Sequence, residues 1–200
     1  MSRPTATAGT TTAVIIAGGE ARRMGGREKG LLPLRGKPLF AHVLERLRPQ
    51  VERVRINANR QLADYGAAGV PVFADDEQWP AGPLRGILTS FAHADTPWLL
   101  FVPCDTPALP ADLLARLAAA AAREGLPVAV AHDGERQQSL CLLVHRDLQA
   151  ALADFAARGG RAIHRWLATT PHAVADFADT PAAFINLNTP DELAHANDAT

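Results

Sequence analysis

Residues 13–30, AVIIAGGEARRMGGREKG, are the part of this sequence that decides the fold. The first four are apolar and predict a buried strand, and the loop that follows contains five glycines, three arginines and one lysine. Glycine lets main-chain N–H groups approach a ligand closely, and a series of such groups attracts anions. The basic side chains add positive charge. A strand that ends in this loop predicts phosphate binding at its carboxyl end.

The loop is neither of the two common glycine-rich phosphate motifs. It lacks the Gly-Lys-Ser/Thr ending of a P-loop, and its two glycine pairs, Gly18-Gly19 and Gly25-Gly26, do not have the G-x-G-x-x-G spacing of dinucleotide-binding proteins. The phosphate site therefore has to be worked out from the rest of the chain.

Length and composition limit the possible functions. Two hundred residues suit one domain, and we expect a flexible tail over residues 1–12 followed by a single domain over 13–198. The net charge of −1 argues against a general polyanion binder, and no apolar run is long enough to cross a membrane, so we expect neither nucleic acid nor a membrane as partner. Both cysteines, Cys104 and Cys141, lie in apolar surroundings, which favours a reducing, cytoplasmic location.

Strand and helix patterns alternate along the chain. The predicted helices cover residues 38–48, 84–92, 109–124, 146–157, 162–168 and a last helix from 189. The predicted strands after the first cover residues 51–57, 70–73, 98–102, 127–131, 139–144, 172–177 and 184–186. This order predicts an α/β protein, a three-layer αβα sandwich around a mostly parallel sheet.

Ligands of such sheets bind beyond the carboxyl ends of the parallel strands. Every predicted strand end of this kind is followed by a short polar segment. The segments are the glycine-rich loop, Asn57-Ala58-Asn59-Arg60, Asp75-Asp76, Pro103-Cys104-Asp105-Thr106-Pro107 and Asn186-Leu187-Asn188-Thr189.

Asp105 is the main candidate for a metal ligand. A carboxylate at the exit of a buried strand, opposite a phosphate loop, is suited to hold Mg²⁺ against phosphate oxygens. Asp also caps turns, and Asp105 stands just before Thr106-Pro107. The glycine-rich loop favours the metal. Lys29, inside that loop, can neutralise a transferring phosphoryl group, and one of Arg22 and Arg23 is expected to meet phosphate.

Together these segments resemble a known family. Ile16-Ala17-Gly18-Gly19, Arg23-Met24-Gly25-Gly26 and Lys29-Gly30-Leu31 look like the signature loop of nucleotidyltransferases with a Rossmann-like, nucleotide-diphospho-sugar transferase fold. Asn57–Arg60, Gly82-Pro83-Leu84, Pro103–Pro107 and Asn186–Pro190 narrow the resemblance to the molybdenum cofactor guanylyltransferases, in order from about residue 12 to 197. The family often has Asp where this chain has Glu28.

The resemblance implies roles for individual residues. Those implied to bind nucleotide are Ile16, Ala17, Gly18, Gly19, Lys29, Asn57, Asp75, Gly82 and Asp105. Catalysis is expected from Lys29, Asp105 and Arg23, with Asp105 also binding Mg²⁺. Asn186 and Asn188 fall in a stretch that helps hold the acceptor or the metal in related transferases.

The function that the resemblance implies is Mg²⁺-dependent transfer of GMP from GTP to molybdopterin, with release of pyrophosphate, and molybdoenzyme-maturation proteins as possible partners. Asp75 could accept hydrogen bonds from N1–H and the exocyclic amine of guanine, a donor pair that cytosine lacks. Three alternatives stay open: a cytidylyltransferase for the same cofactor, a sugar-phosphate nucleotidyltransferase, and a non-catalytic carrier of GTP or pterin.

Overall fold

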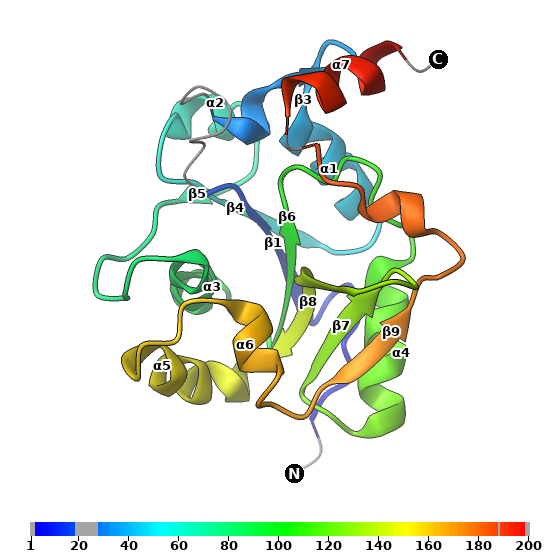
Figure 1. Ribbon diagram of the computed structural model, residues 1–200. Coiled ribbons are helices and arrows are strands. Elements are labelled where there is room, and N and C mark those ends of the chain that lie inside the picture. Colours follow the sequence, from blue (N-terminus) through cyan, green and yellow to red (C-terminus); the bar gives the residue numbers. More distant parts are fainter. Residues whose placement is uncertain (1–2, 19–27, 188, 199–200) are drawn as a thin grey trace.

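The fold is built on a seven-stranded sheet with the order β5-β4-β1-β6-β8-β7-β9 (Figure 1). It is seen in a computed structural model that describes residues 3–18, 28–187 and 189–198. The strands are β1 (Thr11–Ile16), β4 (Arg53–Asn57), β5 (Val72–Phe73), β6 (Trp98–Pro103), β7 (Val128–His132), β8 (Gln137–His145) and β9 (Ala173–Asp176). β8 runs antiparallel to both its neighbours, whereas the other pairings are parallel. The predicted mostly parallel sheet is therefore confirmed.

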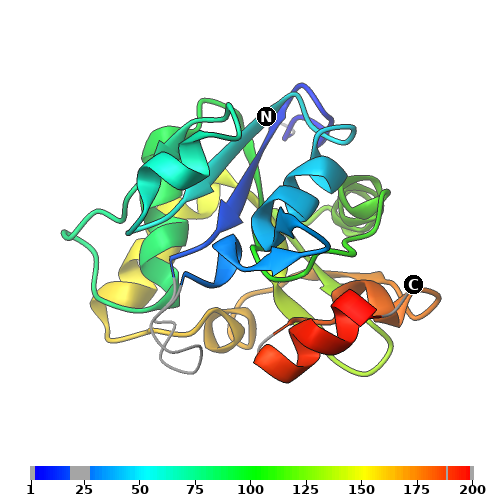
Figure 2. The ribbon, with the colours of Figure 1, turned by 90° about the horizontal axis from the view of Figure 1, so that it is seen from above.

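Helices cover both faces of the sheet (Figure 2). On one face pack α1 (Leu39–Leu47) and α4 (Leu113–Glu124), and on the other α3 (Pro83–Ser90), α5 (Gln149–Ala157) and α6 (Ile163–Leu167). Residues of β1 alternate between the two layers: Ala13 and Ile15 face α1 and α4, and Val14 faces α3. The three-layer αβα sandwich is thus confirmed.

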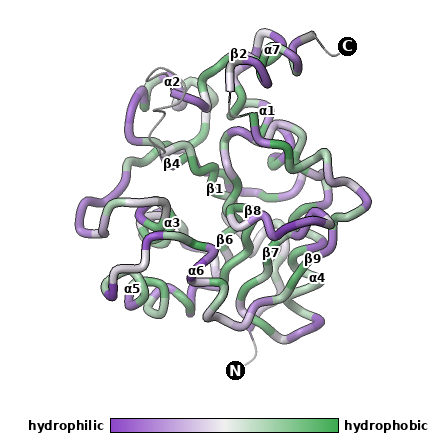
Figure 3. Tube along the Cα trace, viewed as in Figure 1, coloured by the Kyte–Doolittle hydropathy of each residue, from purple (hydrophilic) through white to green (hydrophobic). Residues whose placement is uncertain are grey.

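The central strands are apolar because both of their faces are covered. Five consecutive residues of β6, from Trp98 to Val102, are buried, and the tube coloured by hydropathy is green along β1 and β6 (Figure 3). Burying a side chain of this size contributes about 1.5–3 kcal/mol relative to leaving it exposed. A rigid strand of this kind can hold the residue at its end in one place.

Shorter elements gather around the carboxyl ends of the strands. They are η2 (Lys29–Leu31), the hairpin of β2 (Pro33–Leu34) and β3 (Lys37–Pro38), α2 (Leu62–Gly66), η5 (Pro181–Phe184) and α7 (Pro190–Asp198). A third apolar cluster of Leu32, Leu34, Leu39 and Leu187 holds this end together, with Leu193 of α7 against it. α7 lies at the end of the sheet towards which β6 points (Figure 1). Two further 3-10 turns, η3 (Phe91–His93) and η4 (Arg146–Leu148), lie apart from these elements. η4 follows His145, which pairs with Trp98 at the start of β6, and Arg146 donates to the carbonyl of Phe91.

Two sequence predictions need correction. Residues 184–186 do not form a strand: η5 ends at Phe184, because Pro181 at its start favours a helical turn and the three-residue pattern is too short to identify a strand. Thr11 and Thr12, placed in the flexible tail, are fully buried residues of β1. Before them, the carbonyl of Pro4 accepts a hydrogen bond of 2.7 Å from Trp98 Nε1. No helix among the described residues is long and apolar enough to cross a membrane.

Candidate active site

The ends of three neighbouring strands form the floor of the site. Ile16 at the end of β1 is in register with Asn57 of β4 on one side and with Pro103 of β6 on the other. The main chain stays paired one step further, since Ala17 N–H donates to the carbonyl of Asn57 at 2.8 Å and Cys104 N–H donates to that of Ile16 at 3.2 Å. Beyond this point the connections diverge, which is the position where open α/β sheets bind ligands.

Lys29 and Asp105 meet across this floor. Lys29 stands in η2 and Asp105 follows β6, and the lysine ammonium forms an ion pair with Oδ2 of the carboxylate. Both side chains are largely buried, with 21% of Lys29 and 11% of Asp105 exposed. The other oxygen, Oδ1 of Asp105, is buried and accepts no hydrogen bond from the described residues. A buried carboxylate oxygen with an open acceptor position is a suitable ligand for a cation or for a donor on a substrate.

The position of Lys29 is fixed by its two neighbours in sequence. Glu28 is 7% exposed and forms an ion pair of 2.6 Å with Arg60, in the segment that follows β4. Gly30 lies against the buried ring of Tyr65, so close that a Cβ at Gly30 would be 2.6 Å from the tyrosine hydroxyl oxygen. The chain around Lys29 is therefore anchored to β4 and α2. Glu28 is part of this anchor.

A second polar cluster lies at the ends of β4 and β5. Asn57 is fully buried and donates from Nδ2 to Oδ1 of Asp75 at 2.9 Å. Asn59 donates from Nδ2 to Oδ2 of Asp75 at 2.9 Å. The loop glycine Gly18 lies over the same cluster, because a Cβ there would be 3.0 Å from Asn59 Nδ2 and 3.3 Å from Asn57 Oδ1. The structure thus brings Gly18, Asn57 and Asp75 together.

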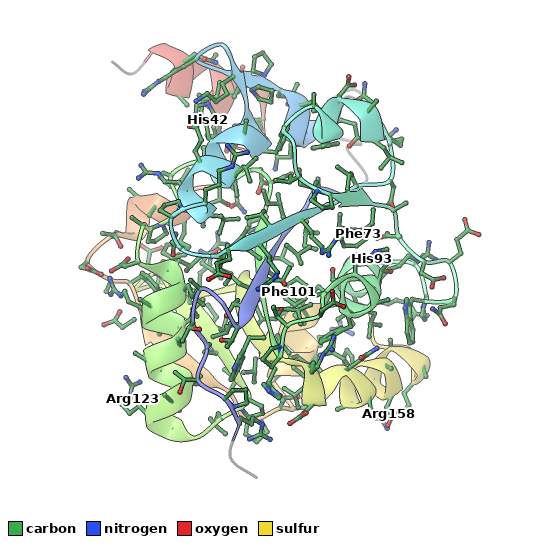
Figure 4. All side chains as sticks on the ribbon, turned by 180° about the vertical axis from the view of Figure 1, so that it is seen from behind. His42, Phe73, His93, Phe101, Arg123 and Arg158 are labelled. Atoms are coloured by element: carbon green, nitrogen blue, oxygen red, sulfur yellow. The ribbon has the colours of Figure 1, made fainter. Side chains whose placement is uncertain are left out.

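Helix α3 closes the far side of this cluster. A Cβ at Gly86 would be 2.3 Å from Asn57 Oδ1, so the helix can approach only because residue 86 has no side chain. The hydroxyl oxygen of Thr89 accepts a hydrogen bond of 2.9 Å from Asp76 N–H. After α3, the His93 ring stacks on Phe73 of β5 with 4.2 Å between centroids (Figure 4). These contacts hold the segment that carries Asp75 against α3.

Gly82 lies just before α3. Its nearest contacts are with Arg161, not with the Lys29–Asp105 pair or the Asn57–Asp75 cluster. Its φ of +135° requires glycine, and the atoms nearest to an added Cβ belong to Arg161, at 3.5 Å. The structure joins Gly82 to the segment between α5 and α6. Its predicted nucleotide-binding role stays a prediction.

The segment after η5 passes beside Asp105. Leu187 N–H donates to the main-chain carbonyl of Asp105 at 3.1 Å, and Thr106 Oγ1 donates to Oδ1 of Asn186 at 2.6 Å. Asn186 is thus bonded to the residue that follows Asp105, and its predicted acceptor or metal role stays a prediction. The predicted residues Gly19, Arg23 and Asn188 lie outside the described residues.

Cys104 separates β6 from Asp105 and has a structural role. It is 6% exposed, and burial, with the negative charge of Asp105 as a second cause, raises the pKa of its thiol far above the ordinary value. Burial likewise raises the pKa of Cys141. Both cysteines are free and stay protonated thiols, which suits small core residues and not nucleophiles.

The donor set fits a magnesium ion. Among the described residues no three His, Cys, Asp or Glu side chains gather in a metal-binding group. Mg²⁺ in nucleotide enzymes is commonly held by one or two carboxylates, with phosphate oxygens and water completing the octahedron. Asp105, whose Oδ1 is buried and has no hydrogen-bond partner in the described part of the chain, offers a ligand of this kind.

Most of these residues lie at predicted strand ends, but several of their contacts have no signal in the sequence. Arg60 and Thr106 were part of quoted segments, yet nothing in their spacing indicates that they pair with Glu28 and Asn186. Tyr65 lies in α2, a five-residue helix that was not predicted. One sequence feature does point to Tyr65: it is the single tyrosine of the chain and stands soon after the polar segment Asn57–Arg60.

Comparison with known proteins gives the class of this protein. The family model described as the MobA-like NTP transferase domain matches residues 13–174, and this range includes all three strand ends of the site. Among solved structures, molybdopterin-guanine dinucleotide biosynthesis protein A from Archaeoglobus fulgidus has the same fold, with a TM-score of 0.76 at 21% identity over 94% of this chain and 97% of that one. The chain is a nucleotidyltransferase.

Two relatives in sequence narrow the class. Molybdenum cofactor guanylyltransferase from Shewanella pealeana is 43% identical over 94% of this chain and 94% of its own length. The enzyme of the same name from Shewanella sp. strain MR-4 is 47% identical over 90% of this chain and 91% of its own length. The chain therefore belongs to the molybdenum cofactor guanylyltransferase family.

Proposed function

We propose that this enzyme transfers GMP from GTP to a terminal phosphate of molybdopterin, with or without bound molybdenum, and releases pyrophosphate in a Mg²⁺-dependent reaction. The observation that carries the proposal is the buried pair of Lys29 and Asp105 at the end of β6, beside the Asn57–Asp75 cluster. One half of this site is suited to phosphate and metal, and the other half offers hydrogen-bonding groups to a base.

The chemistry is an in-line displacement at the α-phosphorus of GTP. A phosphate oxygen of molybdopterin forms the new P–O bond, and the bond between the α-phosphorus and the bridging oxygen to the β-phosphate breaks. The attacking oxygen is already anionic near neutral pH, so the site needs no strong general base. Catalysis then rests on positioning and on neutralising charge.

Four residues have a part in this proposal. Asp105 would hold Mg²⁺, which would supply positive charge that stabilises the phosphates. Lys29 turns from Asp105 towards the phosphates and stabilises the charge that develops on the pyrophosphate. Asp75 accepts hydrogen bonds from guanine. Arg23, from the glycine-rich loop, is a further proposed phosphate contact.

Location and partners belong to the same proposal. The two buried free cysteines support a cytoplasmic enzyme, because free thiols persist in a reducing compartment. Molybdoenzyme-maturation proteins, proposed from the family resemblance, would receive the dinucleotide product.

The test is an assay of pyrophosphate release by the purified protein with molybdopterin, Mg²⁺ and each of GTP, CTP, ATP and UTP. We expect release with GTP and its loss in Asp105→Ala. A preference for CTP would replace the substrate and leave the fold unaffected. Binding of GTP without pyrophosphate release would favour the carrier. Turnover near the wild-type level in Asp105→Ala at saturating Mg²⁺ would remove Asp105 from the mechanism.

A further inference from the structure

Asn59 makes a reciprocal pair of hydrogen bonds with Asp75. Its side-chain N–H donates to Oδ2 of Asp75 at 2.9 Å, and its side-chain oxygen accepts from the main-chain N–H of Asp75 at 2.8 Å. One amide group therefore holds both the main chain and the carboxylate of Asp75. The two residues come from different strand ends, since Asn59 follows β4 and Asp75 follows β5.

The other carboxylate oxygen of Asp75 is held by Asn57, the last residue of β4. Nδ2 of the fully buried Asn57 donates to Oδ1 of Asp75 at 2.9 Å. With an amide N–H on each oxygen, the plane of the carboxylate is fixed, although the final torsion of an aspartate side chain is otherwise broad. The remaining lone pairs of both oxygens then point in set directions, as required for accepting two parallel hydrogen bonds.

We propose that Asn59 is a positioning residue for guanine selection: it holds the Asp75 carboxylate in the orientation that accepts N1–H and the 2-amino group of guanine together. This inference rests on the proposed function. Without the Asn59 amide, Oδ2 of Asp75 loses its protein donor and bonds to water, because Asp75 is only partly buried. The carboxylate can then rotate, so it no longer accepts N1–H and the 2-amino group of guanine at the same time. A single hydrogen bond to guanine can still form.

Inosine triphosphate separates these two kinds of contact. Hypoxanthine carries N1–H but lacks the 2-amino group, so it presents one donor where guanine presents two. A carboxylate held in plane distinguishes the two bases, and a rotating carboxylate does so less well. The preference for GTP over inosine triphosphate is therefore a readout that a merely structural role of Asn59 would not change.

The variants are Asn59→Ala, Asn59→Asp and the matched control Gln78→Ala. Gln78 also donates an amide N–H to a carboxylate, that of Asp76, next to Asp75 in sequence but outside the cluster. In Asn59→Ala we expect KM for GTP to rise about tenfold, the factor that corresponds to one hydrogen bond to a charged group, with kcat within about twofold of wild type. The preference for GTP over inosine triphosphate should fall by a similar factor.

Asn59→Asp distinguishes the donor from the shape of the side chain. It keeps the oxygen that accepts from Asp75 N–H, replaces the donor by an acceptor, and places a like charge beside Asp75. We expect a larger rise in KM for GTP than in Asn59→Ala. Gln78→Ala should retain the wild-type KM and base preference. Thermal unfolding of each variant checks that the fold is intact.

Direct binding of both nucleotides, measured calorimetrically in the presence of Mg²⁺, separates this inference from the proposed function. Wild-type protein that binds GTP more tightly than inosine triphosphate but releases no pyrophosphate would contradict the transfer reaction and leave the Asn59 comparison valid. Equal base preference in wild type and Asn59→Ala would overturn the role of Asn59, even if GMP transfer is observed. Equal binding of the two nucleotides by the wild type would also overturn it.

Discussion

Lys29 and Asp105 form an ion pair although they are 76 positions apart in the sequence. Each of these largely buried charges is compensated by the other, because an unpaired buried charge is costly. In the function proposed above, the phosphates of the nucleotide would compete with Asp105 for the lysine ammonium. Asp105 would then hold the metal ion while Lys29 contacts the phosphates.

The first prediction concerns the lysine charge. Lys29→Met keeps the length of the side chain and removes the ammonium, which leaves Asp105 without its cation and the pyrophosphate without charge stabilisation. We expect pyrophosphate release to fall about 10²–10³-fold, as for the loss of one preorganised donor at a developing anion. The control is Lys37→Met, which removes the exposed ion pair with Glu45 and should be within about twofold of wild type. Turnover of Lys29→Met within a few-fold of wild type would contradict the assigned role.

A second prediction concerns the contact between α3 and the Asn57–Asp75 cluster. Gly→Ala in a helix is normally favourable by about 1 kcal/mol, but a Cβ at Gly86 would be 2.3 Å from Oδ1 of Asn57. Gly86→Ala should therefore weaken GTP binding at least tenfold and lower the unfolding midpoint. The control is Gly66→Ala in α2, where the nearest atom to the new Cβ is 4.0 Å away. Titration calorimetry and thermal unfolding check both variants, and an unchanged affinity in Gly86→Ala would show that Asn57 is not needed where it lies.

The third prediction concerns pH and His145, at the end of the sheet opposite the site. Burial holds the pKa of His145 below its ordinary value of 6.5, with the nearby Asp147 acting in the other direction. Below pH 6.5 the unfolded chain takes up a proton here before the folded protein does. The free energy of unfolding therefore falls as the pH is lowered, and it is unaffected by this group at higher pH.

His145→Gln should reduce this pH dependence, measured as denaturant unfolding between pH 7 and about pH 5. His164, exposed on α6, is the control, and His164→Gln should leave the dependence unchanged. An NMR titration of the His145 ring in the wild type gives a second test that does not depend on the variant folding. A pKa above 6.5 in that titration would contradict the prediction.

Much of the fold could be predicted from periodicity. The apolar run of Trp98–Val102 and the glycine break after Ile16 identify β6 and β1, and strand–helix alternation then requires a parallel sheet with two helical layers. The pattern fails where an element is too short to have a period. Residues 184–186 look like a strand, but Phe184 ends a 3-10 turn and the two residues after it pair with no strand, and the five-residue helix α2 leaves no detectable pattern.

The site could be predicted as a set of strand ends but not as a set of contacts. The carboxyl ends of β1, β4 and β6 bring Asn57 and Asp105 to one edge because register fixes where parallel strands stop. Which side chains then pair depends on rotamers and on close approach. Glycine at position 86 permits the approach of α3, and the reciprocal bonds of Asn59 and Asp75 need distances that no spacing in the sequence gives.

The hydrogen bond from Leu187 to the main chain of Asp105 makes the C-terminal segment part of the site without making it part of the sheet. The last strand, β9, ends at Asp176, and the segment that flanks Asp105 lies beyond it in the chain. A chain shortened just before Asn186 would therefore keep every strand of the seven-stranded sheet and still lose one side of the Asp105 site.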